Sequence, residues 1–386
     1  MLRLACDLAL AGAKRIYVVW NGGGDPPDLA VLSRDRRLAR HARLEVVTEV
    51  PCGDDGDTIL VARGDRLFHR DMPKLVVSAR AASGAQIGKI AGDEHDGVIA
   101  ADRATARRLA MRAFEAGGMA RVLGSASIGE AELPYAGFTA RASGPRALRR
   151  AEKQLVWSLR KAADGIASKA INRHISLRIS WALSGTKVHP NHITLAALVF
   201  ALAGAATIAS GGYLAGVAGM LLVNVGSIID GCDGEIARLR FQFSRVGQWL
   251  DTTVDDLANI AYISGVIASL SASSEAWAFP IGAVALAAFV ITQTTQYALI
   301  TLVYKSGDLA AIPWAFQSAD SLARTSLSAT LPKLLKRDFV VTLFCVFAVL
   351  GKLDWILVGW ATGALVFFVV LFVQLARNTR SLRTTS

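Results

Sequence analysis

Four aspartates stand together between long apolar segments in the second half of the chain. Asp230 and Asp233 are three residues apart and Asp251 and Asp255 are four apart, so on a helical backbone each pair shares one helix face. A carboxylate at or inside a membrane boundary is costly unless it is partnered, and it usually marks a functional site. Clustered anions repel one another, and divalent cations that prefer hard oxygen ligands are the natural compensation. The stretch therefore predicts a site for magnesium, manganese or calcium at the edge of a membrane.

The composition supports a chain that is partly embedded in a membrane. Of the 386 residues, 53% are hydrophobic, and the mean hydropathy is +0.39. Most ionisable residues lie before about residue 180, and apolar runs dominate beyond it. The net charge of +11 comes from basic residues beside the apolar runs, which fits anionic lipid headgroups better than nucleic acid. We therefore expect membrane lipids, and no nucleic acid, among the partners.

Apolar windows predict six membrane spans, of which the fifth is short. The spans are at about residues 193–210, 213–230, 248–270, 276–303, 338–351 and 354–375. The loops on one side contain a single basic residue, Lys352, whereas those on the other side contain many. By the positive-inside rule both termini and the acidic stretch face the cytoplasm, so we expect an integral inner-membrane protein. A helical bundle buried in water would not produce this alternation.

The second and third predicted spans form a helical hairpin. The second span ends with Asp230 and Asp233, and the third begins with Asp251 and Asp255 in its first turns. The hairpin is therefore expected to bring the two carboxylate pairs together.

Residues 1–144 are predicted to form a soluble α/β domain, and residues 190–378 an all-α bundle of six transmembrane helices. The expected fold class is therefore multi-domain. Short β-branched or apolar runs predict strands at residues 15–20, 43–48, 58–62 and 97–101, and helices are expected at residues 73–83 and 103–116. Such alternation favours a parallel sheet covered by helices.

Residues 145–189 join the two halves and are predicted to form basic juxtamembrane helices. Arginines and lysines are interleaved with apolar residues, which is typical of an amphipathic helix in the headgroup layer. The alternative is an ordinary solvated helix that packs on the soluble domain.

Eight positions at fixed offsets fit the signature D-x2-D-G-x2-A-R-x8-G-x3-D-x3-D. These positions are Asp230, Asp233, Gly234, Ala237, Arg238, Gly247, Asp251 and Asp255. On these residues the chain resembles the CDP-alcohol phosphotransferase family of membrane enzymes. Residues 190–194, P-N-H-I-T, look like the family's P-N-x-x-T opening of the first span. The resemblance covers about residues 161–377.

The resemblance implies a site for two divalent ions, Mg²⁺ or Mn²⁺. Asp230, Asp233 and Asp251 would be the main ligands. Asp255 would also lie near the second ion, and by resemblance it is the general base that takes the proton of an acceptor hydroxyl.

The resemblance also implies a set of substrate-binding residues. Arg238 would clamp a phosphate, because a guanidinium makes paired charge-assisted hydrogen bonds to phosphate oxygens. Asn191 and Thr194 would offer polar groups near the nucleotide. Arg337, where the fifth span starts, either binds an acceptor phosphate or is an ordinary topology-setting charge. Gly234, Ala237 and Gly247 complete the set, and the glycines let ligand or backbone approach closely.

The implied reaction moves a phosphoalcohol group from a CDP-alcohol to an acceptor hydroxyl and releases CMP. The donor is of the CDP-diacylglycerol or CDP-inositol type, and the acceptor is a polyol phosphate or a lipid hydroxyl. The family also suggests a homodimer formed through the spans.

The first domain resembles the nucleotidyltransferase that is fused to some members of this family, which make and use CDP-inositol. Residues 57–65 resemble the strand that presents a metal-binding aspartate, here Asp65. The family's glycine-rich nucleotide loop has no counterpart in the sequence, since Gly22–Gly24 has neither its pattern nor its position. We expect a non-catalytic docking module, with an active cytidylyltransferase as the alternative.

Two other functions are weighed against the transferase. A cation transporter would distribute its carboxylates through the depth of the membrane, whereas these four cluster near one face. A non-catalytic membrane scaffold for a cytidylyltransferase would not need the intact signature.

Overall fold

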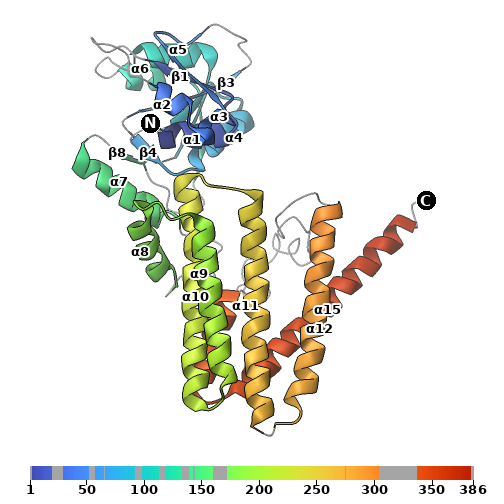
Figure 1. The fold of residues 1–386 in the computed structure, drawn as a ribbon. Helices are drawn as coiled ribbons and strands as arrows, with labels where there is room; N and C mark the ends of the chain where they lie inside the picture. Colours follow the sequence, from blue (N-terminus) through green and yellow to red (C-terminus); the bar gives the residue numbers. More distant parts are fainter. Residues whose placement is uncertain are drawn as a thin grey trace. The chain divides into compact units, whose positions relative to one another are not determined.

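The computed structural model describes residues 2–19, 29–51, 57–64, 66–91, 98–112, 118–132, 139–141, 144–159, 172–273, 275–303 and 337–383. The chain forms two compact units, divided in the sequence between Ala162 and Ala163. The first unit is α/β and the second is a bundle of long helices (Figure 1).

The first unit contains eight strands in the residues that the structure describes. They are β1 (Arg15–Val19), β2 (Arg43–Val47), β3 (Thr58–Ala62), β4 (Arg66–Phe68), β5 (Ile87–Ile90), β6 (Val98–Asp102), β7 (Ile128–Ala131) and β8 (Thr139–Arg141). The helices are α1 (Leu2–Leu10), α2 (Ala30–Ser33), α3 (Arg36–Ala39), α4 (Met72–Ser83), α5 (Arg103–Arg112), α6 (Gly118–Gly124) and α7 (Pro145–Trp157). The four runs expected as strands and the two expected as helices are found with shifts of a few residues at their ends.

The expected parallel sheet is wrong for most of the pairings. The main sheet has the order β3-β6-β5-β7, and β6 pairs antiparallel with both β3 and β5. Among the described strands, parallel pairing is confined to β5 with β7 and to β1 with β2. Residues 91–97, which join β5 to β6, are too few for a helical crossover, so the two strands run in opposite directions.

The segment at residues 145–189 is divided between the two units. Helix α7 belongs to the first unit, where Ala151, Leu155 and Val156 are buried and the helix packs on β4 and β8. Its basic residues Arg149 and Arg150 are exposed. Helix α7 therefore fits the solvated helix on the soluble domain that the sequence left as the alternative. Asp65 and Gly22–Gly24 lie outside the described residues, so the expectations placed on them stay predictions.

Among the described residues, the second unit consists of one helix in the predicted juxtamembrane segment, followed by helices at the positions of the predicted spans. They are α8 (Arg173–Ser184), α9 (Pro190–Ala209), α10 (Tyr213–Arg240), α11 (Arg245–Ala272), α12 (Ala278–Ala298) with the π-helical turn η2 (Leu299–Val303), α14 (Arg337–Val349) and α15 (Leu353–Arg383). Within the described ranges, four segments are long and apolar enough to cross a membrane: Pro190–Ala209, Tyr213–Arg240, Ala278–Val303 and Leu353–Ala376. Helix α11 is more polar because its first half carries three aspartates, and α14 has 13 residues. A membrane domain is thus supported, while the number six stays a prediction.

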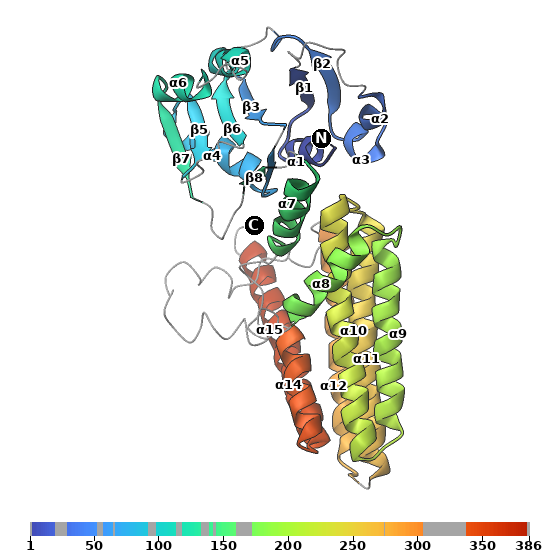
Figure 2. The same cartoon turned by 90° about the vertical axis from the view of Figure 1, so that its left-hand side faces the viewer.

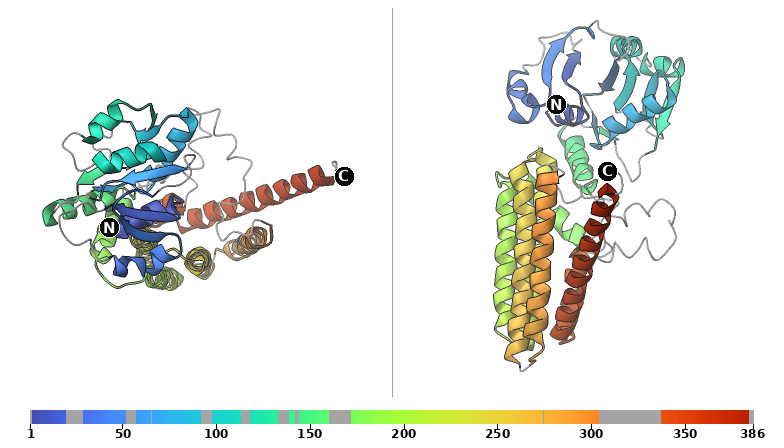
Figure 3. Two further views of the ribbon diagram at one scale, coloured as in Figure 1. Left: turned by 90° about the horizontal axis from the view of Figure 1, so that it is seen from above. Right: turned by 90° about the vertical axis from the view of Figure 1, so that its right-hand side faces the viewer.

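Short turns make successive helices of the bundle antiparallel. Helices α9 to α12 lie side by side (Figures 2 and 3), and α15 runs obliquely to α12 (Figure 1). Side chains such as Val199, Leu214 and Phe279 are 63%, 78% and 65% exposed on the outside of the bundle. Apolar exposure on this scale fits a surface that faces lipid.

Glycines let α9 pack backbone against backbone on its two neighbours. A Cβ at Gly204 would lie 2.6 Å from the carbonyl oxygen of Gly219 in α10, and one at Gly265 in α11 would lie 2.5 Å from that of Ala205. Small residues at such contacts are typical of helix packing in membranes. The contacts fix α9 against both helices that carry the aspartates.

Gly265→Ala is expected to destabilise the bundle by about 1–3 kcal/mol, because the added methyl group must displace a backbone carbonyl. Gly363→Ala in α15 is the matched control, since no heavy atom beyond its own helix lies within 4 Å of a Cβ there. It is expected to be neutral or slightly stabilising. The stability of both variants is measured by unfolding the detergent-solubilised proteins with SDS or heat. Equal stability of Gly265→Ala and Gly363→Ala would contradict the close packing at Gly265.

The first unit buries an ionisable pair in α1. Asp7 is 2% exposed, and its Oδ2 lies 3.5 Å from Nε of Arg3, one helical turn away. Burial raises the pKa of Asp7 from 3.8 to about 6, and the nearby arginines only partly offset that effect. Since the folded pKa is the higher one, the stabilising contribution is fully present below about pH 4 and is lost as the pH rises through about 6.

Asp7→Asn removes this titration while keeping the shape of the side chain. The stability of the wild type relative to the variant is therefore expected to fall by up to about 3 kcal/mol between pH 4 and pH 7. Hydrogen exchange of the backbone amides of α1 and β1, corrected for intrinsic rates, measures it. A stability difference that does not change with pH would contradict the assignment.

Candidate active site

The polar ends of α9, α10 and α11 meet at one end of the bundle, because the chain reverses between α10 and α11. Helix α10 is followed by the C-cap residue Phe241, whose φ of 54° is left-handed and whose amide donates to the carbonyl of Ala237. Three residues later, Ser244 is the N-cap residue of α11, and its hydroxyl accepts a hydrogen bond from the amide of Gly247 at 2.9 Å. This tight connection places the last turns of α10 beside the first turns of α11.

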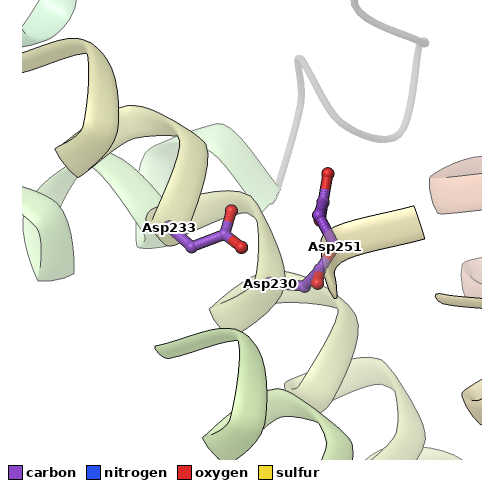
Figure 4. Close-up of side chains that lie close together, drawn as sticks. All are labelled: Asp230, Asp233 and Asp251. Atoms are coloured by element: carbon purple, nitrogen blue, oxygen red, sulfur yellow. The ribbon is translucent and has the colours of Figure 1, made fainter. Parts of the chain in front are cut away.

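Three of the four signature aspartates converge there. Asp230 and Asp233 in α10 and Asp251 in α11 each offer a carboxylate oxygen, and these oxygens all lie within 4.8 Å of one another. Figure 4 shows Asp251 beside Asp230, with Asp233 on the adjoining turn. An all-carboxylate oxygen set at this spacing fits hard divalent cations such as Mg²⁺ and Mn²⁺. The repulsion among the carboxylates also requires a cation or a proton.

The most deeply buried ligand is oriented by α9. Asp233 is 8% exposed and Thr194 is 2% exposed. The Thr194 hydroxyl donates to Oδ2 of Asp233, and the amide of Gly234 contacts Oδ1. Thr194 therefore hydrogen-bonds one of the three clustered carboxylates. The expectation that it contacts the nucleotide stays a prediction.

Asp255 lies outside the group of three. Its Oδ1 pairs with Nη1 of Arg337, at the start of α14, and the same nitrogen lies 3.4 Å from Oδ2 of Asp230. The Asp255 side chain is 32% exposed. Asp255 is thus not part of the cluster of three carboxylates. Its expected position near a second ion stays a prediction. Arg337, 107 residues from Asp230 in the sequence, lies beside both carboxylates. Whether it binds an acceptor phosphate stays a prediction.

The remaining signature residues pack around the cluster. A Cβ at Gly234 would lie 3.2 Å from Nη1 of Arg238, and one at Gly247 would lie 3.3 Å from Oδ1 of Asn191. The groups that approach these two glycines are therefore side chains of the same chain. The expectation that a ligand approaches these glycines stays a prediction.

Sequence reasoning missed two polar sets that hold these helices in place. One centres on Glu235, inside the signature but at an unspecified position, which binds α8. The other centres on Asp256 in α11, which accepts a hydrogen bond from Nε2 of Gln293 in α12 at 2.6 Å and another from the hydroxyl of Tyr297. A polar side chain inside a membrane is costly unless it has a hydrogen-bonding partner. The sequence could therefore have indicated that Glu235 and Asp256 have partners, but not which residues these are.

The comparison with protein families supports the same chemistry. Residues 187–370 match the family model described as CDP-alcohol phosphatidyltransferase. The matched segment contains all eight signature positions as well as Asn191, Thr194 and Arg337.

Three curated relatives share the name "Bifunctional IPC transferase and DIPP synthase". The protein of Archaeoglobus fulgidus is 39% identical over 118 residues, which are 30% of this chain and 23% of the relative. That of Aquifex aeolicus is 31% identical over 130 residues, 33% of this chain and 29% of the relative. That of Rubrobacter xylanophilus is 36% identical over 122 residues, 32% of this chain and 27% of the relative. The matches thus span less than a third of each relative's length.

The family model and the carboxylate geometry agree on the same part of the chain. The helices that carry Asp230, Asp233, Asp251 and Asp255 all lie inside the matched segment. Residues 187–370 are therefore similar to the CDP-alcohol phosphatidyltransferase family over the segment that contains the signature.

Proposed function

We propose that this protein is an integral-membrane CDP-alcohol phosphotransferase that moves a phosphoalcohol group from a CDP-alcohol to an acceptor hydroxyl and releases CMP. The observation that carries the proposal is the convergence of Asp230, Asp233 and Asp251 at the end of an apolar bundle, with Asp255 and Arg337 alongside. Because the acids cluster at one end within the described helices, the arrangement suits a surface reaction better than a cation pathway.

The three clustered aspartates would hold the divalent ions. When bound, such ions neutralise charge on the diphosphate of the donor and on the departing CMP. The ion pair of Arg337 with Asp255 and Asp230 places a guanidinium within reach of the same phosphates. Arg238 lies over Gly234, one turn from Asp233, and provides a second guanidinium.

Asp255 is the proposed general base. The oxygen of the acceptor hydroxyl attacks the β-phosphorus of the CDP-alcohol, and its proton passes to the Asp255 carboxylate. A bond forms between that oxygen and the β-phosphorus. The bond from the β-phosphorus to the bridging oxygen breaks, and CMP leaves with that oxygen. Asp255 suits the role because it lies outside the ligand cluster and is partly exposed.

The relatives guide the proposal for the substrates. Their name contains both a transferase and a DIPP synthase activity. Residues 57–65 of the first unit resemble the nucleotidyltransferase of fused enzymes that make CDP-inositol. We therefore place a CDP-inositol type donor with a polyol phosphate acceptor first, and CDP-diacylglycerol second. The proposal includes an inner-membrane location with the site facing the cytoplasm, and a homodimer.

Asp255→Asn is expected to lower CMP release by about 10²–10⁴-fold at saturating substrates, because the amide cannot take the proton. The assay gives membranes labelled CDP-inositol or CDP-diacylglycerol, candidate acceptors and Mn²⁺. Asp354→Asn, at the start of α15 and outside the site, is the control and is expected to transfer at the wild-type rate. Undiminished release by Asp255→Asn would remove this residue from the base role.

Chelation with EDTA is expected to abolish transfer, and Mg²⁺ or Mn²⁺ should restore it. The divalent ion should also raise the unfolding temperature of the wild type, because a ligand that binds only the folded state stabilises it. Asp233→Asn and Asp251→Asn should each lose most of that increase, whereas Asp354→Asn should keep it. An increase that survives both substitutions would show that the ions bind elsewhere.

A further inference from the structure

The carboxylate of Glu235 points away from the metal cluster, although it lies only two residues after Asp233. Its side chain is 0% exposed, and three donors from α8 surround it. Oε1 accepts from Nη1 of Arg173 at 2.5 Å and from the hydroxyl of Ser176 at 2.7 Å. Oε2 accepts from the hydroxyl of Ser180 at 2.6 Å. A buried carboxylate with this many donors is a strong and directional tie between two helices.

The inner face of α8 combines this polar tie with apolar packing. Ser176, Ser180 and Leu177 are 1%, 0% and 1% exposed, whereas Ile175 and Trp181 on the same helix are 41% and 52% exposed. Ile179 and Leu183 pack against the apolar cluster that contains Ile236 of α10. The outer Ile and Trp suit a lipid interface, and the inner face is matched to Glu235.

A second charge on α10 holds the other end of α8. The guanidinium of Arg240 donates to the carbonyls of Leu183, Thr186 and Val188, each at 2.5 Å. The first of these is an end carbonyl of α8, and the others lie in the turn that leads to α9. Glu235 and Arg240 together fasten the whole segment from Arg173 to Val188 to the last two turns of α10.

These contacts connect α10 to α8, and α8 leads through the turn to α9, which contacts Asp233 of α10. The fastened turn leads directly into α9, where Thr194 donates to Asp233 and Asn191 lies beside Gly247. A shift of α8 would move the start of α9 and thereby the donor on the most buried metal ligand.

We propose that Glu235 is a positioning residue that, through α8 and the start of α9, holds Asp233 in the geometry needed for divalent-ion binding and phosphoryl transfer. This inference rests on the proposed function. Groups that orient metal ligands in this way typically change metal affinity or activity by about 10–100-fold when they are removed.

The test replaces Glu235 by glutamine in the full-length protein, which keeps the shape and removes the charge that pairs with Arg173. The concentration of Mn²⁺ for half-maximal binding, followed by the electron paramagnetic resonance of free Mn²⁺, should rise at least about tenfold. At saturating Mn²⁺ the kcat for CMP release should fall by a similar factor while KM for the acceptor stays within about twofold. Glu275→Gln, at the opposite end of α11 from the site, is the matched control and should change neither quantity.

A double-mutant cycle separates positioning from general loosening. Ser176→Ala with Ser180→Ala should weaken Mn²⁺ binding, and the same pair of changes added to Glu235→Gln should have a clearly smaller effect, because the partners act as one unit. If the serine changes weaken Mn²⁺ binding by the same factor with and without Glu235→Gln, the proposed coupling between Glu235 and these serines is overturned.

The outcomes are distinct. If folded Glu235→Gln binds Mn²⁺ and transfers like the wild type, or unfolds at a lower temperature with unchanged Mn²⁺ affinity, the residue is only structural and the proposal is overturned. If the wild type releases no CMP with any donor, the proposed function fails instead. The Mn²⁺ affinities of the wild type, Glu235→Gln and Glu275→Gln then still decide whether Glu235 positions the metal site.

Discussion

The mutual repulsion of aspartates at the end of an apolar bundle is the constraint on which the rest of the structure depends. Asp230, Asp233 and Asp251 bring their oxygens within 4.8 Å of one another, where charges interact strongly because little water separates them. The fold must therefore hold the helices together against that repulsion, and it must admit the cations that relieve it. Close packing below the site and polar ties around it meet the first requirement. The open, partly exposed side near Asp255 meets the second.

Helix α9 carries no acidic residue, yet it is the element that makes the site possible. Its Ala205 carbonyl approaches Gly265 of α11, and its Gly204 lies against Gly219 of α10. These contacts permit separations that larger side chains would prevent. Because α9 is fixed to both neighbours, Thr194 at its start is delivered to Asp233 without a separate loop. Packing in the apolar part thus sets the geometry of the polar part.

The charged residues around the cluster divide into two kinds. Arg337 lies at the clustered carboxylates and Arg238 lies at Gly234. Glu235 and Arg240 bind α8 and its turn. Residues two apart on α10 therefore contact different partners, because they point to opposite sides of a helix.

The sequence by itself determined that an α/β unit precedes a bundle of apolar helices. Spacings of three and four predicted that the paired aspartates share helix faces, and the hydropathy predicted membrane helices, because both are properties of local periodicity. The tertiary structure alone decided the rest. The antiparallel pairing of β6 with β3, the packing of α7 on β4, the pairing of Asp255 with Arg337 and the burial of Glu235 against α8 all join residues that are far apart in the chain. Such contacts depend on which surfaces meet, and local periodicity carries no information about that.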